Sequence, residues 1–171
     1  MSLIRRRFPL RESEKRRFLE DLSKRFPEVR RLIGDKPQIE VVGTRESEVF
    51  IIDGKPLLVR VYGEIIPSLF IFENLTSLLP KVIVDMGAVP HICNGADVMA
   101  PGIVRIEGEF GEGDYVVVLD EKYSKAIAVA KALINSEDAK FIRHGKVFRN
   151  LHYVGDSCWR VMREIYSERK G

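Results

Sequence analysis

The run VIVDMGAVPHICNGADVMAPGI, from Val82 to Ile103, brings a strand, a helix and a tight turn into one short segment. Residues 82–84 are β-branched and predict a short buried strand. Asp85 follows as a side chain able to cap a helix, and the sequence predicts that helix from Met86 to Cys93. The chain is therefore expected to leave a strand and enter a helix at Asp85.

Residue types also predict where this helix ends and where the chain next reverses direction. Pro90 cannot donate to the carbonyl of Met86, so it should bend or delay the helix. Asn94-Gly95 offers the left-handed conformation that ends a helix. Residues 100–103, APGI, predict a type II turn, with proline second and glycine third.

Side chains are short or missing at six positions of the segment. The small residues are Gly87, Ala88, Gly95, Ala96, Ala100 and Gly102. They predict a small concave surface that another molecule's backbone can approach, and free amides at a helix start attract phosphate. The same residues are equally expected if the chain only needs a tight corner. Both interpretations stay open at this point.

The segment resembles a known family signature. Residues 85–89, DMGAV, and 94–102, NGADVMAPG, are similar to the signature of the PUA domain, the RNA-binding module of pseudouridine synthases and archaeosine transglycosylases. The likeness continues in order through 110–118, FGEGDYVVV, and 126–130, AIAVA. It then includes 145–153 and extends to Trp159. It covers roughly half the chain. The resemblance implies a mainly-β PUA pseudo-barrel that binds RNA.

The residues before this region resemble a second family. IDGKP at 52–56 and IPS at 66–68 are similar to archaeal relatives of the "multiple copies in T-cell lymphoma" translation factors, whose eukaryotic kin include ligatin. The resemblance implies an α+β N-terminal domain, the pre-PUA domain, over residues 1–80, a PUA domain over 81–160 and a C-terminal tail over 161–171. It also implies binding to the small ribosomal subunit, in initiation, reinitiation or recycling.

Composition limits the class of protein. The chain has 171 residues with 45% hydrophobic content, which is ample for packed cores. No apolar run is long enough to span a bilayer, and the start, MSLIRRR, lacks the apolar centre of a signal peptide. We therefore expect a cytoplasmic protein without a membrane partner. Cys93 and Cys158 predict neither a disulfide framework nor a zinc finger, although a single bridge stays possible.

Charge is distributed unevenly along the chain. Residues 1–36 hold 12 Lys/Arg against 6 Asp/Glu, residues 37–139 hold 8 against 16, and residues 140–171 hold 8 against 3. The two ends are therefore basic and the middle is acidic. If the ends meet on one face, that face should attract phosphates. Alternatively, the cations only keep helix surfaces soluble.

The first half predicts two helical pieces and three strands. Apolar spacing predicts an amphipathic helix over 11–33, broken near Pro27, with Ser13 as cap and Gly34 as stop. Strands are expected at 39–42, 49–52 and 57–61, with Asp53-Gly54 as a hairpin turn. Gly63 should end this set. Residues 64–79 read as a helical or extended connector.

The second half predicts short strands closed into a small barrel. They are expected at 103–106, 115–119, 126–133 and 146–153, with a helical turn at 136–138. Residues 156–171 should begin as a strand and end as a short helix. Trp159 should fill a core, while stacking on a base is the alternative.

No enzyme active site is expected. Among His91, His144, His152, Cys93 and Cys158, the pair His91 and Cys93 alone has metal-ligand spacing, which is too little for a site. No nucleophile–base pattern or phosphate loop occurs. We therefore predict a non-catalytic protein without metal or cofactor.

The predicted RNA-binding residues form two sets. The walls of the cleft are Met86, Gly87, Ala88, Gly95, Ala96, Met99, Ala100, Pro101 and Gly102, and the cations are Lys81, Arg105, Arg143, Lys146 and Arg149.

Together these features predict an accessory factor of translation. Its expected partners are RNA (tRNA or ribosomal RNA), the small ribosomal subunit and a small initiation-factor-like protein. Two alternatives stay open: a targeting subunit for tRNA or rRNA modification, and a protein-interaction module that does not bind RNA.

Overall fold

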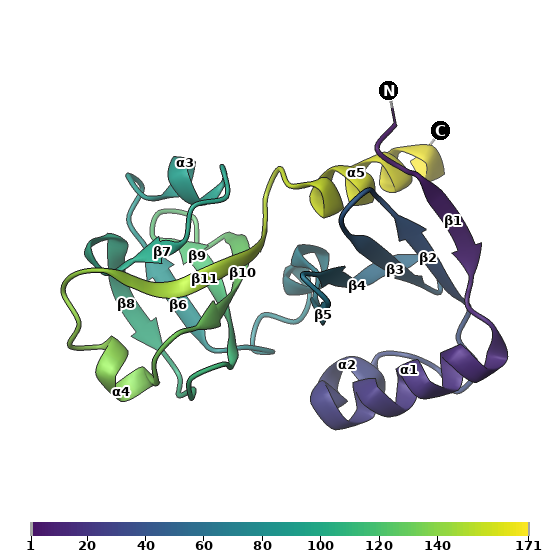
Figure 1. Cartoon of the computed structure of the whole chain (residues 1–171), viewed down its shortest axis with the longest axis horizontal. Helices are drawn as coiled ribbons and strands as arrows, with labels where there is room; N and C mark the ends of the chain where they lie inside the picture. The colour runs from purple at the N-terminus through teal and green to yellow at the C-terminus, as the bar shows by residue number, and fades with distance from the viewer. Residues whose placement is uncertain (1, 171) are drawn as a thin grey trace.

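The computed structural model, which describes residues 2–170 and the side chains up to residue 168, forms two sheets side by side (Figure 1). The first sheet is antiparallel throughout and has the strand order β1-β2-β3-β4-β5. Its strands are β1 (Arg6–Pro9), β2 (Ile39–Gly43), β3 (Glu48–Ile52), β4 (Lys55–Val61) and β5 (Glu64–Pro67).

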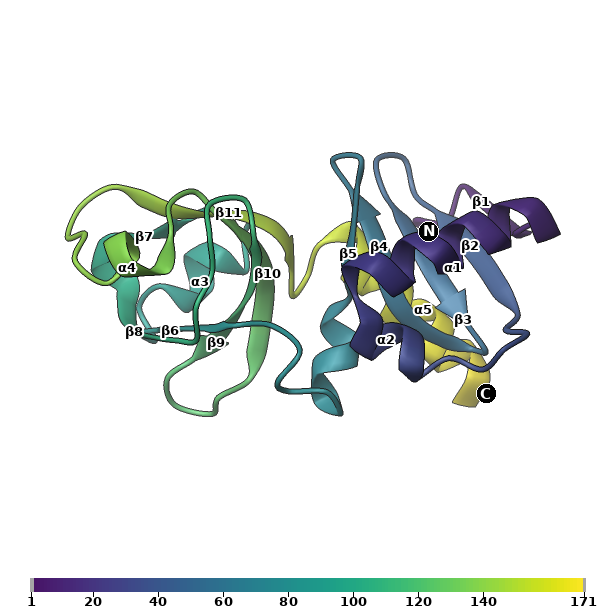
Figure 2. The ribbon, with the colours of Figure 1, turned by 90° about the horizontal axis from the view of Figure 1, so that it is seen from below.

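Helices cover both faces of this sheet. Helices α1 (Glu12–Arg25) and α2 (Pro27–Arg31) lie on one face, and α5 (Ser157–Lys170) lies on the other (Figures 1 and 2). The Phe18 ring of α1 stacks on the Phe50 ring of β3 with centroids 4.8 Å apart. Because both faces are covered, residues 49–52 are all buried and show no alternation of polar and apolar positions.

The second sheet is mixed and has the order β7-β11-β10-β9-β6-β8. Its strands are β6 (Lys81–Val84), β7 (Val98–Met99), β8 (Ile103–Glu107), β9 (Tyr115–Asp120), β10 (Ala126–Ala132) and β11 (Lys146–Tyr153). Strand β6 pairs parallel to β9, and register shifts interrupt the pairings of β10. Such irregularities bend strands, and the sheet curls around its own core (Figure 1). The prediction of an α+β domain followed by a mainly-β pseudo-barrel is confirmed.

Four short helical pieces complete the chain. They are η1 (Leu69–Glu73), α3 (Val89–Ile92), η2 (Ala100–Gly102) and α4 (Ser136–Ala139). The predicted helical turn at 136–138 is confirmed as α4, which Asn135 caps by accepting the Asp138 N–H at 2.9 Å.

Two local predictions in the first domain are wrong, and one strand was missed. Ser13 is not the helix cap, since α1 begins after Arg11, which makes no side-chain capping bond. Gly63 does not end the sheet, because Tyr62-Gly63 turns the chain into β5. Strand β1 was not predicted at all, since its residues RRFP are exposed and carry no apolar alternation.

The C-terminal segment also differs from its prediction. Residues 157–170 form helix throughout, with no initial strand, and return to the first sheet (Figure 1). Cys158, Val161 and Ile165 are buried in the first core. The Asp156 carboxylate accepts the Trp159 N–H at 2.8 Å and so satisfies the helix start. Trp159 is half-buried against the same core.

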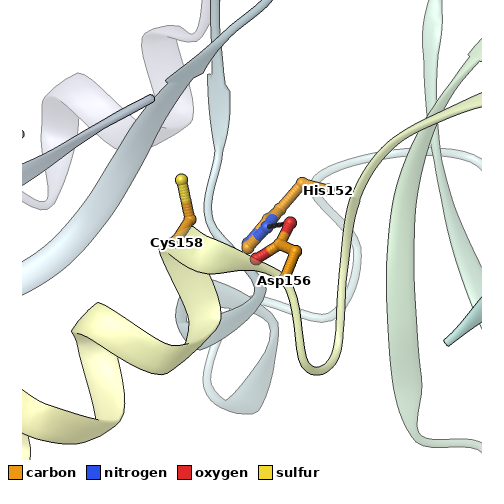
Figure 3. Close-up of side chains that lie close together, drawn as sticks. All are labelled: His152, Asp156 and Cys158. Carbon is orange, nitrogen blue, oxygen red and sulfur yellow. Dashed lines mark hydrogen bonds and ion pairs between the residues drawn. The ribbon is translucent and has the colours of Figure 1, made fainter. Parts of the chain in front are cut away.

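Polar side chains tie the two sheets together. The Leu69 N–H of η1 donates to Nε2 of His152 on β11 at 3.1 Å. A backbone N–H can only donate, so Nδ1 carries the ring hydrogen and donates it to Asp156 at 2.7 Å (Figure 3). Glu64 of β5 accepts from the Tyr115 hydroxyl and from Lys131, each at 2.7 Å. Every one of these contacts joins the first domain to the second or orders the connection between them.

Candidate nucleic-acid interface

Residues 85–102, here named the signature loop, close on themselves next to β6. The Asp85 N–H donates to the Gly102 carbonyl at 2.9 Å, which joins the two ends of the loop. The Asp85 carboxylate accepts the Ala88 N–H at 2.8 Å. Asp85 therefore caps a turn at 86–88, and helix α3 begins only at Val89, one residue before Pro90. The predicted helix is shorter than expected, and proline delays it.

The type II turn predicted at 100–103 is wrong. Residues Ala100–Gly102 form a 3₁₀ turn, and Gly102 has no positive φ. The glycine serves a different need, since an added Cβ at residue 102 would lie 3.0 Å from the Ala88 Cβ. Its missing side chain lets the two ends of the signature loop touch.

Gly95 provides the left-handed conformation that the sequence predicted. Its φ is +97°, and an added Cβ would meet the Tyr153 hydroxyl at 3.1 Å. Residue 95, the third after the end of α3, is therefore restricted to glycine by its backbone conformation and by the space around it.

Asn150 of β11 holds the far side of the signature loop. Its Nδ2 donates to the carbonyls of Ile92 and Ala96, both at 3.0 Å. The Asn150 N–H donates to the Asp97 carboxylate at 2.8 Å. The residue is 6% exposed, so these bonds are shielded from water and fix the loop to the sheet. Sequence reasoning assigned no role to Asn150, whose only signal was an amide side chain inside the strand expected at 146–153.

Asp97 connects the hydrogen bonds of Asn150 to a surface cation, Lys146. Its other carboxylate oxygen lies 2.7 Å from Nζ of Lys146. Partial burial raises the pKa of Asp97, but the hydrogen bonds from Lys146 and from the Asn150 N–H, with the charges of Lys146 and Arg149, outweigh it and hold the pKa below its ordinary value. Asp97 is therefore ionised at neutral pH and orients Lys146 beside Met99, its partner in register across β7 and β11.

The predicted wall residues differ in exposure. The exposed ones are Met86, Gly87, Gly95, Ala96, Met99 and Pro101. Ala88 and Gly102 are half-buried, and Ala100 is buried, with 8% of its surface exposed. The structure brings Ala88 against Gly102 and Met99 beside Lys146. The Ala100 N–H donates to the Gly145 carbonyl at 2.8 Å, which places the 143–146 loop next to η2.

The predicted cations do not all lie together. Lys146 stands beside the signature loop, and Arg143 is exposed in the adjoining loop without an ion pair in the described part of the chain. Arg105 pairs with Glu107 at 3.2 Å on β8. Lys81 starts β6, whereas the signature loop leaves the other end of that strand, about 13 Å away at 3.3 Å per residue.

The basic N-terminal segment does not flank the signature loop. The two chain ends do meet, since Arg7 of β1 lies 3.3 Å from Glu168 of α5. They meet on the first domain, and α1 and α2 lie at the opposite end of the molecule from α3 (Figure 1). The cations of residues 1–36 therefore do not flank the signature loop, whereas Lys146 does.

A shallow hollow of about 310 Å³ lies beside η2, between β8 and the end of α4. Its rim carries Arg105 and Lys140, and its exposed apolar residues are Val104 and Ile142. The sequence did not indicate Lys140 or Ile142, because they follow α4 and come near β8 only through the fold.

One cluster has metal-ligand residue types. The ligand atoms of His152, Asp156 and Cys158 lie within 4.8 Å of one another (Figure 3). Both ring nitrogens of His152 already have hydrogen-bond partners, and burial raises the pKa of the Cys158 thiol to about 12. The cluster is therefore a buried structural contact with a protonated thiol. Cys93 and Cys158 are both free, so the bridge that the sequence left open is not formed.

Within residues 2–170, none of the helices combines the length and apolar character needed to cross a membrane.

Comparisons with known proteins match both domains. Residues 80–154 match the family model described as PUA domain, and residues 6–74 match a domain of unknown function, DUF1947. An uncharacterized protein of Methanocaldococcus jannaschii is 38% identical over 158 residues, which cover 91% of this chain and 96% of that protein.

Two further matches extend over nearly the whole chain. Translation machinery-associated protein 20 of Saccharomyces cerevisiae is 26% identical over 167 residues, covering 91% of this chain and 92% of the relative. The crystal structure of a PUA domain from Aeropyrum pernix is 28% identical with a TM-score of 0.79, covering 94% of this chain and 92% of that one.

Proposed function

The chain belongs to the family of proteins that join a DUF1947 domain to a PUA domain, and we propose from this that it is a non-catalytic RNA-binding protein. We propose further that it is an accessory factor of translation, which acts on the small ribosomal subunit, on tRNA or on both, in initiation, reinitiation or recycling. The similarity to translation machinery-associated protein 20 supports this role, because it extends over both domains.

The observation that carries the proposal is the exposed, side-chain-poor part of the signature loop. Gly87, Gly95 and Ala96 are exposed, and Asn150 and Asp85 hold the loop in shape through its backbone. A rigid surface without side chains lets an RNA backbone approach to hydrogen-bond distance. RNA with exposed bases or a shaped helix end, such as a tRNA acceptor end, is recognised in this way.

Positive charge would hold the phosphates. Arg143, Lys146 and Arg149 are exposed near or beside the loop, and Lys146 stays oriented by Asp97. We propose that these cations and the walls of the loop make the binding site, with Lys81 and Arg105 as outlying contributors.

The first domain would dock elsewhere. We propose that residues 1–80 contact the ribosome or a small initiation-factor-like protein, that residues 81–160 bind RNA, and that the protein acts in the cytoplasm. Because α5 packs on the first sheet, we assign residues 157–170 to the first domain's structural unit, which shortens the RNA-binding domain to residues 81–156.

A filter-binding titration with bulk tRNA and with 30S subunits tests the proposal across a salt series. Three phosphate contacts predict that log K falls with log salt at a slope of about −2 for single-stranded RNA. Gly87→Leu should weaken binding roughly tenfold, equivalent to about 1.4 kcal/mol of lost contact. Negligible, salt-independent binding would contradict the proposal and favour a protein-interaction module.

Gly34→Leu is the matched control. Gly34 lies after α2 with nothing within 4 Å of an added Cβ, and Gly87 has only the Asp85 carboxylate nearby, at 3.3 Å. Both glycines lack a positive φ, so neither substitution strains the backbone. The Asp85 carboxylate must shift by a few tenths of an ångström to admit a Cβ at residue 87, so the stability of both variants is measured beside their affinity. Equal affinities for the two variants would remove Gly87 from the site. Co-purification with a modification enzyme instead of 30S subunits would favour the targeting role.

A further inference from the structure

Tyr62 occupies an unusual position at the tip of the β4–β5 hairpin. Val61 pairs with Glu64, so the turn consists of Tyr62 and Gly63 alone. Their φ values are 51° and 77°, both left-handed. Two-residue turns of this kind favour asparagine, aspartate or glycine, and a bulky aromatic at positive φ is an outlier.

The neighbouring hairpin shows the usual solution. Asp53 and Gly54 join β3 to β4 with φ values of 47° and 83°. The Asp53 carboxylate accepts the Gln38 N–H at 2.9 Å, so that side chain supports the fold. The Tyr62 hydroxyl makes no hydrogen bond with the described residues. A side chain kept in a disfavoured conformation without a role in its own turn points to a use outside that turn.

The Tyr62 ring is presented to solvent. The residue is 68% exposed, although the guanidinium of Arg149 lies 4.6 Å from the ring centroid. Arg149 comes from β11 of the second domain and has no carboxylate within ion-pair distance among the described residues. The cation therefore holds one face of the ring, and the exposure leaves the rest open.

Strand β11 carries both the residue that contacts the Tyr62 ring, Arg149, and a residue that lies beside the signature loop, Tyr153. Burial raises the pKa of Tyr153 first, and the nearby Asp156 and Tyr62 add to that rise. Tyr153 in turn places its hydroxyl 3.1 Å from the position of an added Cβ at Gly95. Arg149 also precedes Asn150, whose side chain donates to the Ile92 and Ala96 carbonyls of the signature loop, so the ring lies against the strand that holds this loop.

We propose that Tyr62 stacks on an unpaired base of the RNA held by the signature loop, while Arg149 fixes the ring and faces the adjoining phosphate. This inference rests on the proposed function. Aromatic rings stack on any base, and an arginine beside the ring adds attraction for the backbone. An exposed tyrosine and arginine also suit a protein contact. The neighbouring glycine surface and the cations Lys146 and Arg160 favour RNA.

The test compares Tyr62→Asn with Tyr123→Ala in the full chain. Tyr123 is a matched control, since it is 69% exposed with Nζ of Lys122 5.1 Å from its ring, and it lies in the β9–β10 turn. The probes are bulk tRNA and a short single-stranded RNA that carries 2-aminopurine, whose fluorescence reports stacking. Tyr62→Asn should lose affinity roughly fivefold or more and lose the quenching, while Tyr123→Ala changes neither.

Stability gives an independent readout. Asparagine tolerates the left-handed conformation, so Tyr62→Asn should keep or raise the melting temperature while it weakens RNA binding. Tyr62→Phe keeps the ring and should bind like the wild type. Equal affinity and quenching for Tyr62→Asn and Tyr123→Ala would overturn the stacking inference and leave RNA binding intact, as would a Tyr62→Phe that binds as poorly as Tyr62→Asn. A wild-type chain that binds neither probe would overturn both proposals.

Discussion

Asn150 is a single side chain that holds the end of helix α3 and the residues that follow it. Its amide reaches the carbonyls of Ile92 and Ala96, and its backbone N–H reaches Asp97. Its own Oδ1 is buried without a partner among the described residues, so two good bonds outweigh one unsatisfied acceptor. The buried amide of Asn150 thus holds the backbone that carries the exposed glycines of the signature loop.

Asn150→Ala should therefore lower the free energy of unfolding by about 1–3 kcal/mol, because two shielded carbonyls lose their donor. Urea denaturation measures this difference. Asn94→Ala is the control, since Asn94 is exposed in the same loop and its side chain makes no hydrogen bond with the described residues. Equal stability of the two variants would show that Asn150 does not hold the loop.

Asp97 predicts a pH dependence of stability. Its pKa lies below its ordinary value of 3.8, so its ion pair stabilises the fold above that pH and is lost as the pH falls through the folded pKa. Asp97→Asn should be less stable than the wild type at about pH 7, and the difference should shrink at about pH 3. A difference that grows on acidification, measured by urea denaturation at both values, would reverse the sign of this prediction.

At the scale of elements, helix α5 decides the integrity of the first domain. Val161 and Ile165 are 0% and 3% exposed against a sheet whose other face is already covered by α1 and α2. The helix thus converts a one-sided sheet into a three-layered one, and its sequence comes from the far end of the chain.

Ile165→Ala should destabilise the chain by about 2–5 kcal/mol, because it leaves a cavity in this layer. Chemical denaturation followed by circular dichroism checks it. Ser167→Ala, on the exposed side of the same helix, should change stability by less than about 0.5 kcal/mol. If the two substitutions had similar effects, α5 would not be part of the core.

Elements whose own residues carry a pattern were predictable. The β-branched runs at 82–84 and 115–119 and the Asp53-Gly54 turn form the predicted structures, since local preference and burial agree there. Strand β1 was missed because pairing with β2, and no pattern of its own, makes it a strand. The continuous helix α5 was missed because its β-branched and aromatic residues favour strands until they meet the first sheet.

The residues of the candidate site also fall into those that their own type predicts and those that only distant contacts place. The small residues and Gly95 could be predicted from their types, since φ at residue 95 needs glycine. The contacts of Asn150 and Arg149 could not be predicted, because each has a partner far away in sequence. Asn150 bonds Ala96, 54 residues away, and Arg149 lies over the ring of Tyr62. Gly102 was predicted for the wrong reason, which only its contact with Ala88 shows.

At the scale of the whole molecule, the two sheets share a core and a polar seam. Val117, Val129 and Leu151 of the second sheet pack with the first core. His152 is 0% exposed and bonds both Leu69 and Asp156, so it joins the connection on one side and the start of α5 on the other. The domains should therefore unfold together.

Calorimetry should show one transition for the wild type. His152→Phe fills the same space but leaves the buried Leu69 N–H without an acceptor, and should lower stability by about 1–3 kcal/mol and broaden that transition. His91→Phe, at an exposed position, is the control. Two separate wild-type transitions would contradict a shared core.

The most direct test of RNA binding by the signature loop is ultraviolet crosslinking of the full chain to bulk tRNA and to 30S subunits, with the crosslinked peptides identified by mass spectrometry. We expect crosslinks within residues 85–102 and at Tyr62, and their loss in Gly87→Leu. Crosslinks confined to α1 and α2, or absent under conditions where a known RNA-binding protein is captured, would contradict the account.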